Sequence, residues 1–148
     1  MTGRTHIAAS ISLVSVLPPT PATITGLFVG AILPDIDVEG ATITRYLPRI
    51  PVEHRTITHS ILALAVITFL SNLISVQFGV GMAMGYLSHL VLDAMTPTGV
   101  PLLYPLNKKR YFRFPLTIPT GSTLELMFFI VLVIIDVFVY KSILTKIL

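Results

Sequence analysis

Long apolar runs, each ended by prolines or by a group of charges, are the feature that most constrains how this chain folds. They cover residues 7–17, 24–33, 57–78, 82–95 and about 124–146. Hydrophobic residues make up 53% of the chain and charged residues 11%, whereas a soluble domain carries about 25% charged residues. The bilayer is therefore the expected solvent. We predict one all-α domain over residues 1–148, an integral membrane helical bundle of about four to five helices.

The first two runs are each shorter than the roughly 20 residues that a lone spanning helix needs. Between them lie Pro18, Pro19 and Pro21, which lack backbone donors and clash with a preceding helical turn. Two interpretations are open, a short helical hairpin around these prolines or one long kinked segment. The density of prolines favours the hairpin.

The later runs predict further helices. Residues 57–78 are expected to span the membrane and to end at a glycine-containing turn, the stretch FGVG at residues 78–81. Residues 82–95 form the next predicted helix. The last helix opens with Ser122-Thr123-Leu124-Glu125, which has the spacing of a capping box.

The histidines and aspartates gather at one end of this predicted bundle. If each helix crosses once, all of them except Asp136 fall at the same end: His6, Asp35, Asp37, His54, His59, His89 and Asp93. Positions i and i+4 share a helix face, so His89 and Asp93 aim at one point. His89 lies about 9 Å inside its helix end, where a polar group is costly without a partner.

Imidazole and carboxylate groups without thiolates are ligands for zinc, manganese or iron, and the chain has no cysteine. The convergence therefore predicts a site for one or two divalent ions, zinc foremost, at one end of the bundle. The alternative interpretation is a buried hydrogen-bond network that holds no metal.

Two further residues are candidates for catalysis. Arg55, next to His54, is suited to bind an anionic phosphate; the alternative is a positive charge that only marks the cytoplasmic side. Glu125 is suited to act as a general acid or as a further metal ligand; the alternative is its place in the capping box.

The basic residues predict which side of the membrane carries the site. Eight of the ten lie at the site end: Arg4, Arg45, Arg49, Arg55, Lys108, Lys109, Arg110 and Arg113. Lys141 and Lys146 lie at the other end. The positive-inside rule then places the site at the cytoplasmic face of the cell membrane. The basic run at residues 107–113 is expected to meet anionic lipid headgroups, and no nucleic-acid partner is expected.

Several motifs together resemble a known family. The stretches TH at residues 5–6, LPDID at 33–37, HRTITHS at 54–60 and GYLSHLVLDAMTPTGVPLLYP at 85–105 are similar to the YdjM-type family of predicted membrane-bound metal-dependent hydrolases. The resemblance runs from about residue 4 to residue 126, and that family also tends to place a glutamate at the position of Glu125. It often has a histidine where this chain has Val38. The resemblance implies a metal site built from His6, Asp35, Asp37, His54, His59, His89 and Asp93.

A more distant resemblance concerns the chemistry. The stretch HLVLDAMTP is similar to the His-x-x-x-Asp segment, followed by proline, of zinc-dependent phospholipase C and P1-type nucleases. Those all-helical enzymes hydrolyse phosphate esters with a zinc cluster. The histidine that usually follows the proline there is missing, since Gly99 and Val100 stand in that region. The likeness implies phosphoester substrates by analogy.

These observations lead us to expect a membrane-embedded, metal-dependent hydrolase that acts on a phosphoester of a lipid or lipid-linked substrate. A site recessed at the bilayer edge is reached most easily by an amphiphile, and a bound metal lowers the pKa of water. The strongest expected ligands are Asp35, Asp37, His59, His89 and Asp93. His6 and His54 are expected either to bind the metal or to orient its ligands.

Two other classes stay open at this point. An intramembrane metalloprotease is disfavoured because the sequence contains no H-E-x-x-H motif. A non-enzymatic metal carrier or sensor is the second alternative. A carrier should have polar residues that continue through the bundle, and the apolar runs at 57–78 and 124–146 have almost none away from the site.

Overall fold

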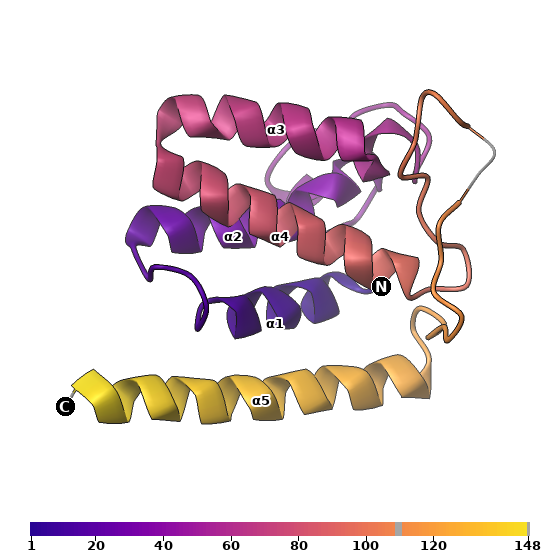
Figure 1. Cartoon of the computed structure of the whole chain (residues 1–148). Coiled ribbons are helices and arrows are strands. Elements are labelled where there is room, and N and C mark those ends of the chain that lie inside the picture. The colour runs from indigo at the N-terminus through magenta and orange to yellow at the C-terminus, as the bar shows by residue number, and fades with distance from the viewer. Residues whose placement is uncertain (109–110, 148) are drawn as a thin grey trace.

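The computed structural model of this protein is all-helical and describes residues 1–108 and 111–147 (Figure 1). Its α-helices are α1 (Gly3–Leu13), α2 (Pro21–Ile32), α3 (Ile61–Ile74), α4 (Val76–Ala94) and α5 (Thr123–Ile147). Short 3-10 helices are η1 (Leu33–Asp37), η2 (Ile43–Arg45) and η3 (Ile57–His59). The predicted all-α fold is confirmed. Lys109 and Arg110, assigned above to the cytoplasmic side, lie outside the described residues.

The proline-rich segment separates two helices, so the predicted hairpin is confirmed. Residues 14–20 connect α1 to α2, and α1 packs against α2. Pro21 occupies the first turn of α2, where a missing N–H costs nothing. The Thr20 side chain caps the helix by accepting a hydrogen bond from the Thr23 backbone N–H at 3.1 Å.

The predicted turn at residues 78–81 is wrong, because the chain reverses at Ser75 instead. Ser75 has an extended backbone (φ −162°, ψ 151°) between α3 and α4, and its hydroxyl accepts a hydrogen bond from the Phe78 N–H. Gly79 and Gly81 lie inside α4. The helix predicted over 57–78 is therefore shorter, and α3 contains 14 residues, which is about 21 Å.

Glycines allow α2 and α4 to pack with their backbones nearly in contact. A Cβ atom added to Gly81 would lie 2.1 Å from the Thr23 carbonyl oxygen, and one added to Gly85 would lie 2.1 Å from that of Leu27. Small residues four apart allow this close approach. The packing explains why glycines occur within α4, and it brings the end of α2 against the end of α4 that carries His89.

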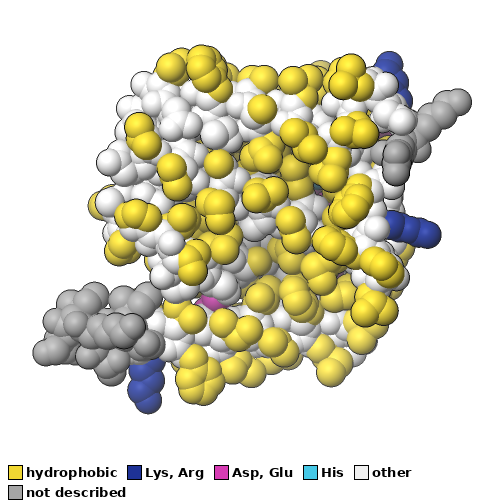
Figure 2. All heavy atoms as spheres, in the orientation of Figure 1, with side chains coloured by type: hydrophobic (Ala, Val, Ile, Leu, Met, Phe, Trp, Pro, Cys, Tyr) yellow, Lys and Arg dark blue, Asp and Glu magenta, His cyan; other side chains and the backbone are white. Residues whose placement is uncertain are grey.

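One helix in the described part of the chain, over Thr123–Lys141 in α5, is long and apolar enough to cross a membrane. Helices α1, α2 and α3 contain 11, 12 and 14 residues and are shorter than the roughly 20 needed. Helix α5 lies beside α1 at the edge of the molecule (Figure 1). Figure 2 shows apolar side chains spread over the helices on this face, with Lys and Arg at its margins.

Candidate metal centre

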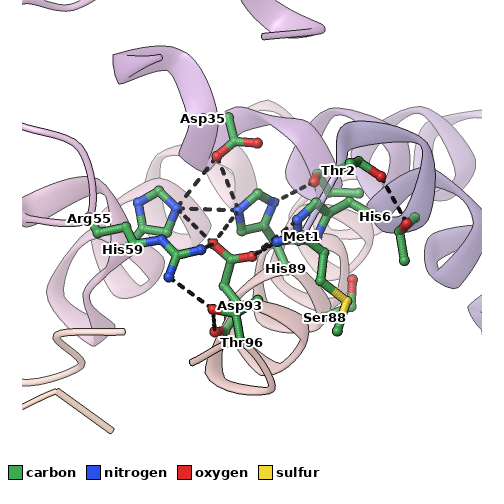
Figure 3. Close-up of polar contacts among 12 residues, drawn as sticks. Met1, Thr2, His6, Asp35, Arg55, His59, Ser88, His89, Asp93 and Thr96 are labelled. Atoms are coloured by element: carbon green, nitrogen blue, oxygen red, sulfur yellow. Dashed lines mark hydrogen bonds and ion pairs between the residues drawn. The ribbon is translucent and has the colours of Figure 1, made fainter. Parts of the chain in front are cut away.

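The structure brings the predicted histidines and aspartates together at one end of the bundle (Figure 3). His6 comes from α1, two aspartates from η1, His59 from η3, and one histidine and one aspartate from the last turns of α4. His54 lies in the loop before η3. The sequence-based expectation that these seven residues meet at one end agrees with their positions: His6, Asp35, Asp37, His54, His59, His89 and Asp93.

Four side-chain atoms in this cluster surround one point. The Nε2 atoms of His59 and His89 are 3.3 Å apart. Asp35 Oδ1 lies 3.6 Å from His59 Nε2 and 3.5 Å from His89 Nε2. Asp93 Oδ2 lies 3.6 Å and 3.8 Å from the same two nitrogens. The four carboxylate–imidazole distances exceed the 2.7–3.2 Å of ordinary N–H···O hydrogen bonds.

These separations have a simple explanation in coordination geometry. Ligand atoms about 2.0–2.2 Å from a tetrahedral zinc ion are about 3.3–3.6 Å from one another. The five distances given above, one between the two nitrogens and four between carboxylate oxygens and nitrogens, run from 3.3 to 3.8 Å. The donor set, two imidazoles and two carboxylates, therefore fits a divalent ion in both size and chemistry.

The second nitrogen of each imidazole fixes the tautomer that metal binding requires. His89 Nδ1 lies 2.8 Å from the Ala31 carbonyl oxygen, which can only accept, so this nitrogen carries the proton. His59 Nδ1 lies 3.0 Å from the Thr58 hydroxyl, which itself donates to Asp37 Oδ2 at 2.6 Å and so accepts from the ring. Both Nε2 atoms consequently direct lone pairs toward the centre of the cluster.

Asp37 lies behind His59 and orients it. Its Oδ1 is 3.0 Å from His54 Nδ1 and its Oδ2 accepts the Thr58 hydroxyl proton. Burial alone would raise the pKa of the Asp37 carboxyl, but the hydrogen bonds from His54 and Thr58 hold it below its usual value. Asp37 was predicted as a ligand, yet its hydrogen bonds are to residues around the cluster. His54 is 42% exposed on its outer side.

Charge and burial favour the metal-binding forms of Asp35 and His59 at neutral pH. Burial would raise the pKa of Asp35, but its contacts with the imidazoles of His59 and His89 hold it well below its usual range. Burial lowers the pKa of His59, more than the neighbouring carboxylates raise it. An ionised carboxylate and a neutral imidazole are the protonation states in which these side chains bind metals.

A hydrogen-bond network alone does not explain why His6 is buried. It is completely buried, and neither ring nitrogen has a hydrogen-bond partner among the described residues. The ring stacks on His89 with 3.7 Å between centroids. Its Nε2 lies 3.3 Å from Asp93 Oδ1, the oxygen that also contacts the Met1 amino group. An unpaired buried polar group costs about 1–3 kcal/mol, and a cation beside Asp93 would give this nitrogen a partner.

Arg55 lies inside the cluster rather than on the surface. One of its guanidinium nitrogens is 3.1 Å from Asp93 Oδ2, and another donates to the Thr96 hydroxyl at 2.9 Å and to the Gly99 carbonyl at 3.0 Å. Its side chain is 11% exposed. The Arg55 backbone has φ 58°, a left-handed conformation that costs about 1–3 kcal/mol and is concentrated at functional sites. These contacts favour a role in the site over that of a surface charge.

Glu125 anchors the start of α1 to α5. Its carboxylate accepts hydrogen bonds from the Thr2 backbone N–H (2.6 Å), the Thr2 and Thr5 hydroxyls (both 2.8 Å) and the Gly121 N–H (2.6 Å). One of the two hydrogen bonds of the predicted capping box is present: Ser122 Oγ accepts from the Glu125 N–H at 3.2 Å. Within the described part of the chain, the Glu125 carboxylate is bonded to the start of α1 and to Gly121. It is not bonded to the four side-chain atoms of the candidate metal site. Glu125 thereby helps to position the helix that carries His6.

Sequence reasoning missed the residues that orient the ligands. Thr58 and the Ala31 carbonyl fix the two imidazoles, and the Tyr86 hydroxyl donates to the Thr58 carbonyl. Thr58 is part of the HRTITHS stretch, so its position next to His59 was a usable signal. A backbone carbonyl gives no signal in a sequence, and the role of Ala31 depends on the close packing of α2 and α4.

The helical fold, the apolar α5 and the buried imidazole–carboxylate cluster define a class of protein: a small all-α protein with one helix apolar enough to cross a membrane and a candidate metal centre at one end. The particular family follows from the sequence. The chain matches the family described as YdjM inner membrane protein over residues 1–146, and it belongs to that family. Membership confirms the resemblance to the YdjM-type family, and the description of the family as an inner membrane protein supports a membrane location.

Individual relatives match to different extents. The uncharacterized protein YvsG of Bacillus subtilis (strain 168) is 32% identical over 139 residues, which cover 84% of this chain and 85% of YvsG. The inner membrane protein YdjM of Escherichia coli (strain K12) is 50% identical over 46 residues, 30% of this chain and 22% of that protein. The uncharacterized protein ORF4' of Methanothermobacter thermautotrophicus is 42% identical over 53 residues, 36% of this chain and 23% of that protein. No solved structure matches the chain.

Proposed function

We propose that this chain is a membrane-embedded, metal-dependent hydrolase that cleaves a phosphoester of a lipid or lipid-linked substrate. The observation that carries the proposal is the convergence of His59 Nε2, His89 Nε2, Asp35 Oδ1 and Asp93 Oδ2, in which the two nitrogens lie 3.3 Å apart and each carboxylate oxygen lies 3.5–3.8 Å from both nitrogens. Zinc suits a four-coordinate site of nitrogen and oxygen ligands best, and manganese and iron are the alternatives. His6, His89 and Asp93 form a neighbouring group whose ligand atoms could hold a second ion.

The protein groups divide the chemical work between them. A divalent ion held by these ligands would lower the pKa of a water bound at a further coordination position and would act as a Lewis acid for the phosphoryl oxygen. Asp37 and Thr58 hold the His59 ring in its binding tautomer. Arg55, fixed by Thr96 and Gly99, directs a guanidinium toward the same oxygen of Asp93. A planar guanidinium in this place suits the developing charge on a phosphate.

Membership in an inner membrane family and the apolar α5 favour an amphiphilic substrate. An apolar pocket of about 420 Å³, lined by Ile61, Leu102, Leu103, Tyr111, Phe112 and Arg113, lies beside the loop of Arg55. The Tyr111 hydroxyl donates to the Arg55 carbonyl at 3.4 Å. Because Tyr111 connects this pocket to the loop that carries Arg55, the pocket offers a place for an apolar tail near the site and favours a lipid phosphoester over a soluble one.

A phosphoester screen with metal removal tests this function. We expect the purified full-length protein to hydrolyse at least one class of lipid phosphoester, to lose that activity after treatment with a chelator, and to regain it with zinc. The measurement is release of phosphate or headgroup from defined lipids in detergent. Hydrolysis that is unaffected by the chelator, or activity in the screen toward peptides alone, would contradict the proposal.

We further propose that the centre faces the cytoplasm, because basic residues gather at its end of the molecule. The natural sequence has no cysteine, so single cysteines report on sidedness without background. Cysteines at Tyr46 and Leu106, which are 80% and 93% exposed, should react with a membrane-impermeant thiol reagent only after cells are opened. A cysteine at Lys141, which is exposed at the far end of the one helix long enough to cross the membrane, is the control and should react in intact cells. The reverse pattern would contradict a cytoplasmic site.

A further inference from the structure

Helices α1 and α5 enclose a long apolar groove that is separate from the metal centre. Its volume is about 740 Å³, within the 300–1,000 Å³ range of ligand pockets. One wall is formed by successive turns of α1 and the other by successive turns of α5. The lining residues are Arg4, Ile7, Ala8, Ile11, Phe129, Val133, Asp136, Val137, Tyr140 and Lys141.

Polar contacts hold the two helices together at both ends of this groove. At the site end, Glu125 binds Thr2 and Thr5, as described above. At the other end, the Ser12 hydroxyl donates to Asp136 at 2.5 Å. The two contacts on α5 are eleven positions apart in the sequence, which is about 16 Å along a helix. This length is close to half of the roughly 30 Å hydrocarbon core, or one lipid leaflet.

A single basic residue marks the site end of the groove. Arg4 is exposed on the first turn of α1, and its guanidinium lies 5.5 Å from the centroid of the Phe129 ring. Among the residues that the structure describes, no carboxylate lies within ion-pair distance of Arg4. A cation of this kind at the mouth of an apolar groove is complementary to a phosphate group with an attached hydrocarbon chain.

We infer that the groove binds one anionic phospholipid, with an acyl chain between α1 and α5 and the phosphate on Arg4. This lipid is distinct from the substrate of the metal centre, because the two sites use different sides of α1. His6 stacks on His89 of α4, whereas Arg4 lies over Phe129 of α5. The bound lipid fills the space that the side chains leave open and so fastens α5 to the rest of the bundle.

Lipid retention by the full-length protein tests this inference. The protein would be placed in nanodiscs that contain equal amounts of phosphatidylglycerol and phosphatidylcholine, transferred to detergent, and analysed for co-purifying lipid by mass spectrometry. Wild-type protein should retain about one phosphatidylglycerol. Arg4→Gln should reduce the preference for phosphatidylglycerol about fivefold, whereas Arg45→Gln, which removes an exposed charge outside the groove, should not.

A second pair of variants separates the groove from the bilayer surface in general. Val133→Trp fills the groove and should abolish retention, whereas Val131→Trp, on an exposed position of the same helix outside the groove, should retain the lipid. His59→Ala should also retain it, so that failure of the metal proposal leaves this test unaffected. Equal retention by the two tryptophan variants would overturn the inference. So would a wild-type dimer that Val133→Trp dissociates without any loss of lipid, because a second copy would then occupy the groove.

Discussion

His89→Ala protein is expected to lose most of its bound metal, and its hydrolytic rate should fall on the order of a thousandfold or more. His89 Nε2 is one corner of the four-atom arrangement, and its Nδ1 is already committed to the Ala31 carbonyl. The helix itself should remain, since alanine is a good helix former. Metal content, thermal stability and turnover measured on the same preparations give the three quantities needed.

The alternative explanation of His89 predicts a different set of results. In a purely structural network, removal of this ring would leave neighbouring groups unpaired, destabilise the fold by about 1–3 kcal/mol and leave turnover per folded molecule nearly unchanged. Ser88→Ala is the matched control, because Ser88 is the adjacent residue and its hydroxyl, among the residues that the structure describes, donates to the Gly85 carbonyl within its own helix. A His89→Ala protein that keeps its metal and its turnover would show that this histidine is structural.

Arg55→Gln should retain the metal and lose about 10²–10³-fold in turnover, the usual effect of removing one donor to a developing oxyanion. The guanidinium contacts Asp93 Oδ2 but is not a metal ligand, so metal content and rate should separate in this variant. Arg55→Lys should recover only part of the rate, because an ammonium group lacks the planar fork of the guanidinium.

The control for this prediction is Arg45→Gln, which also removes one positive charge but on an exposed turn. It should leave turnover within about twofold of the wild-type value, as expected for a distant surface charge. If Arg55→Gln lost metal and rate together, Arg55 would be maintaining the geometry of the ligands, and its proposed contact with phosphate would be unsupported.

The position of the site could be predicted from the sequence, because a chain with so few charges has few places for polar residues. Most of the His and Asp residues lie next to helix ends, and antiparallel packing of successive helices brings these helix ends together at one end of the bundle. The close packing of Gly81 and Gly85 against α2 could not be predicted from the sequence. Glycine next to an apolar run is also the signal of a turn, and local pattern alone does not distinguish the two.

The division between ligands and orienting residues also needed the structure. Asp35 and Asp37 are two residues apart on η1 and have the same chemistry, yet Asp35 reaches the two Nε2 atoms while Asp37 reaches Thr58 and His54. The 3-10 turn decides which carboxylate points inward. In the same way, the partners of Glu125 lie at the other end of the chain, where a local capping motif gives no indication of them.

The metal content of the full-length protein tests the central claim most directly. Protein purified without chelator and analysed by elemental mass spectrometry should carry one to two equivalents of a transition metal, zinc foremost, and an Asp35→Ala, Asp93→Ala double variant should carry almost none. The first equivalent corresponds to the four-atom arrangement and a second to the neighbourhood of His6. Folded protein that contains no metal, and that takes up none after incubation with zinc, would contradict the account.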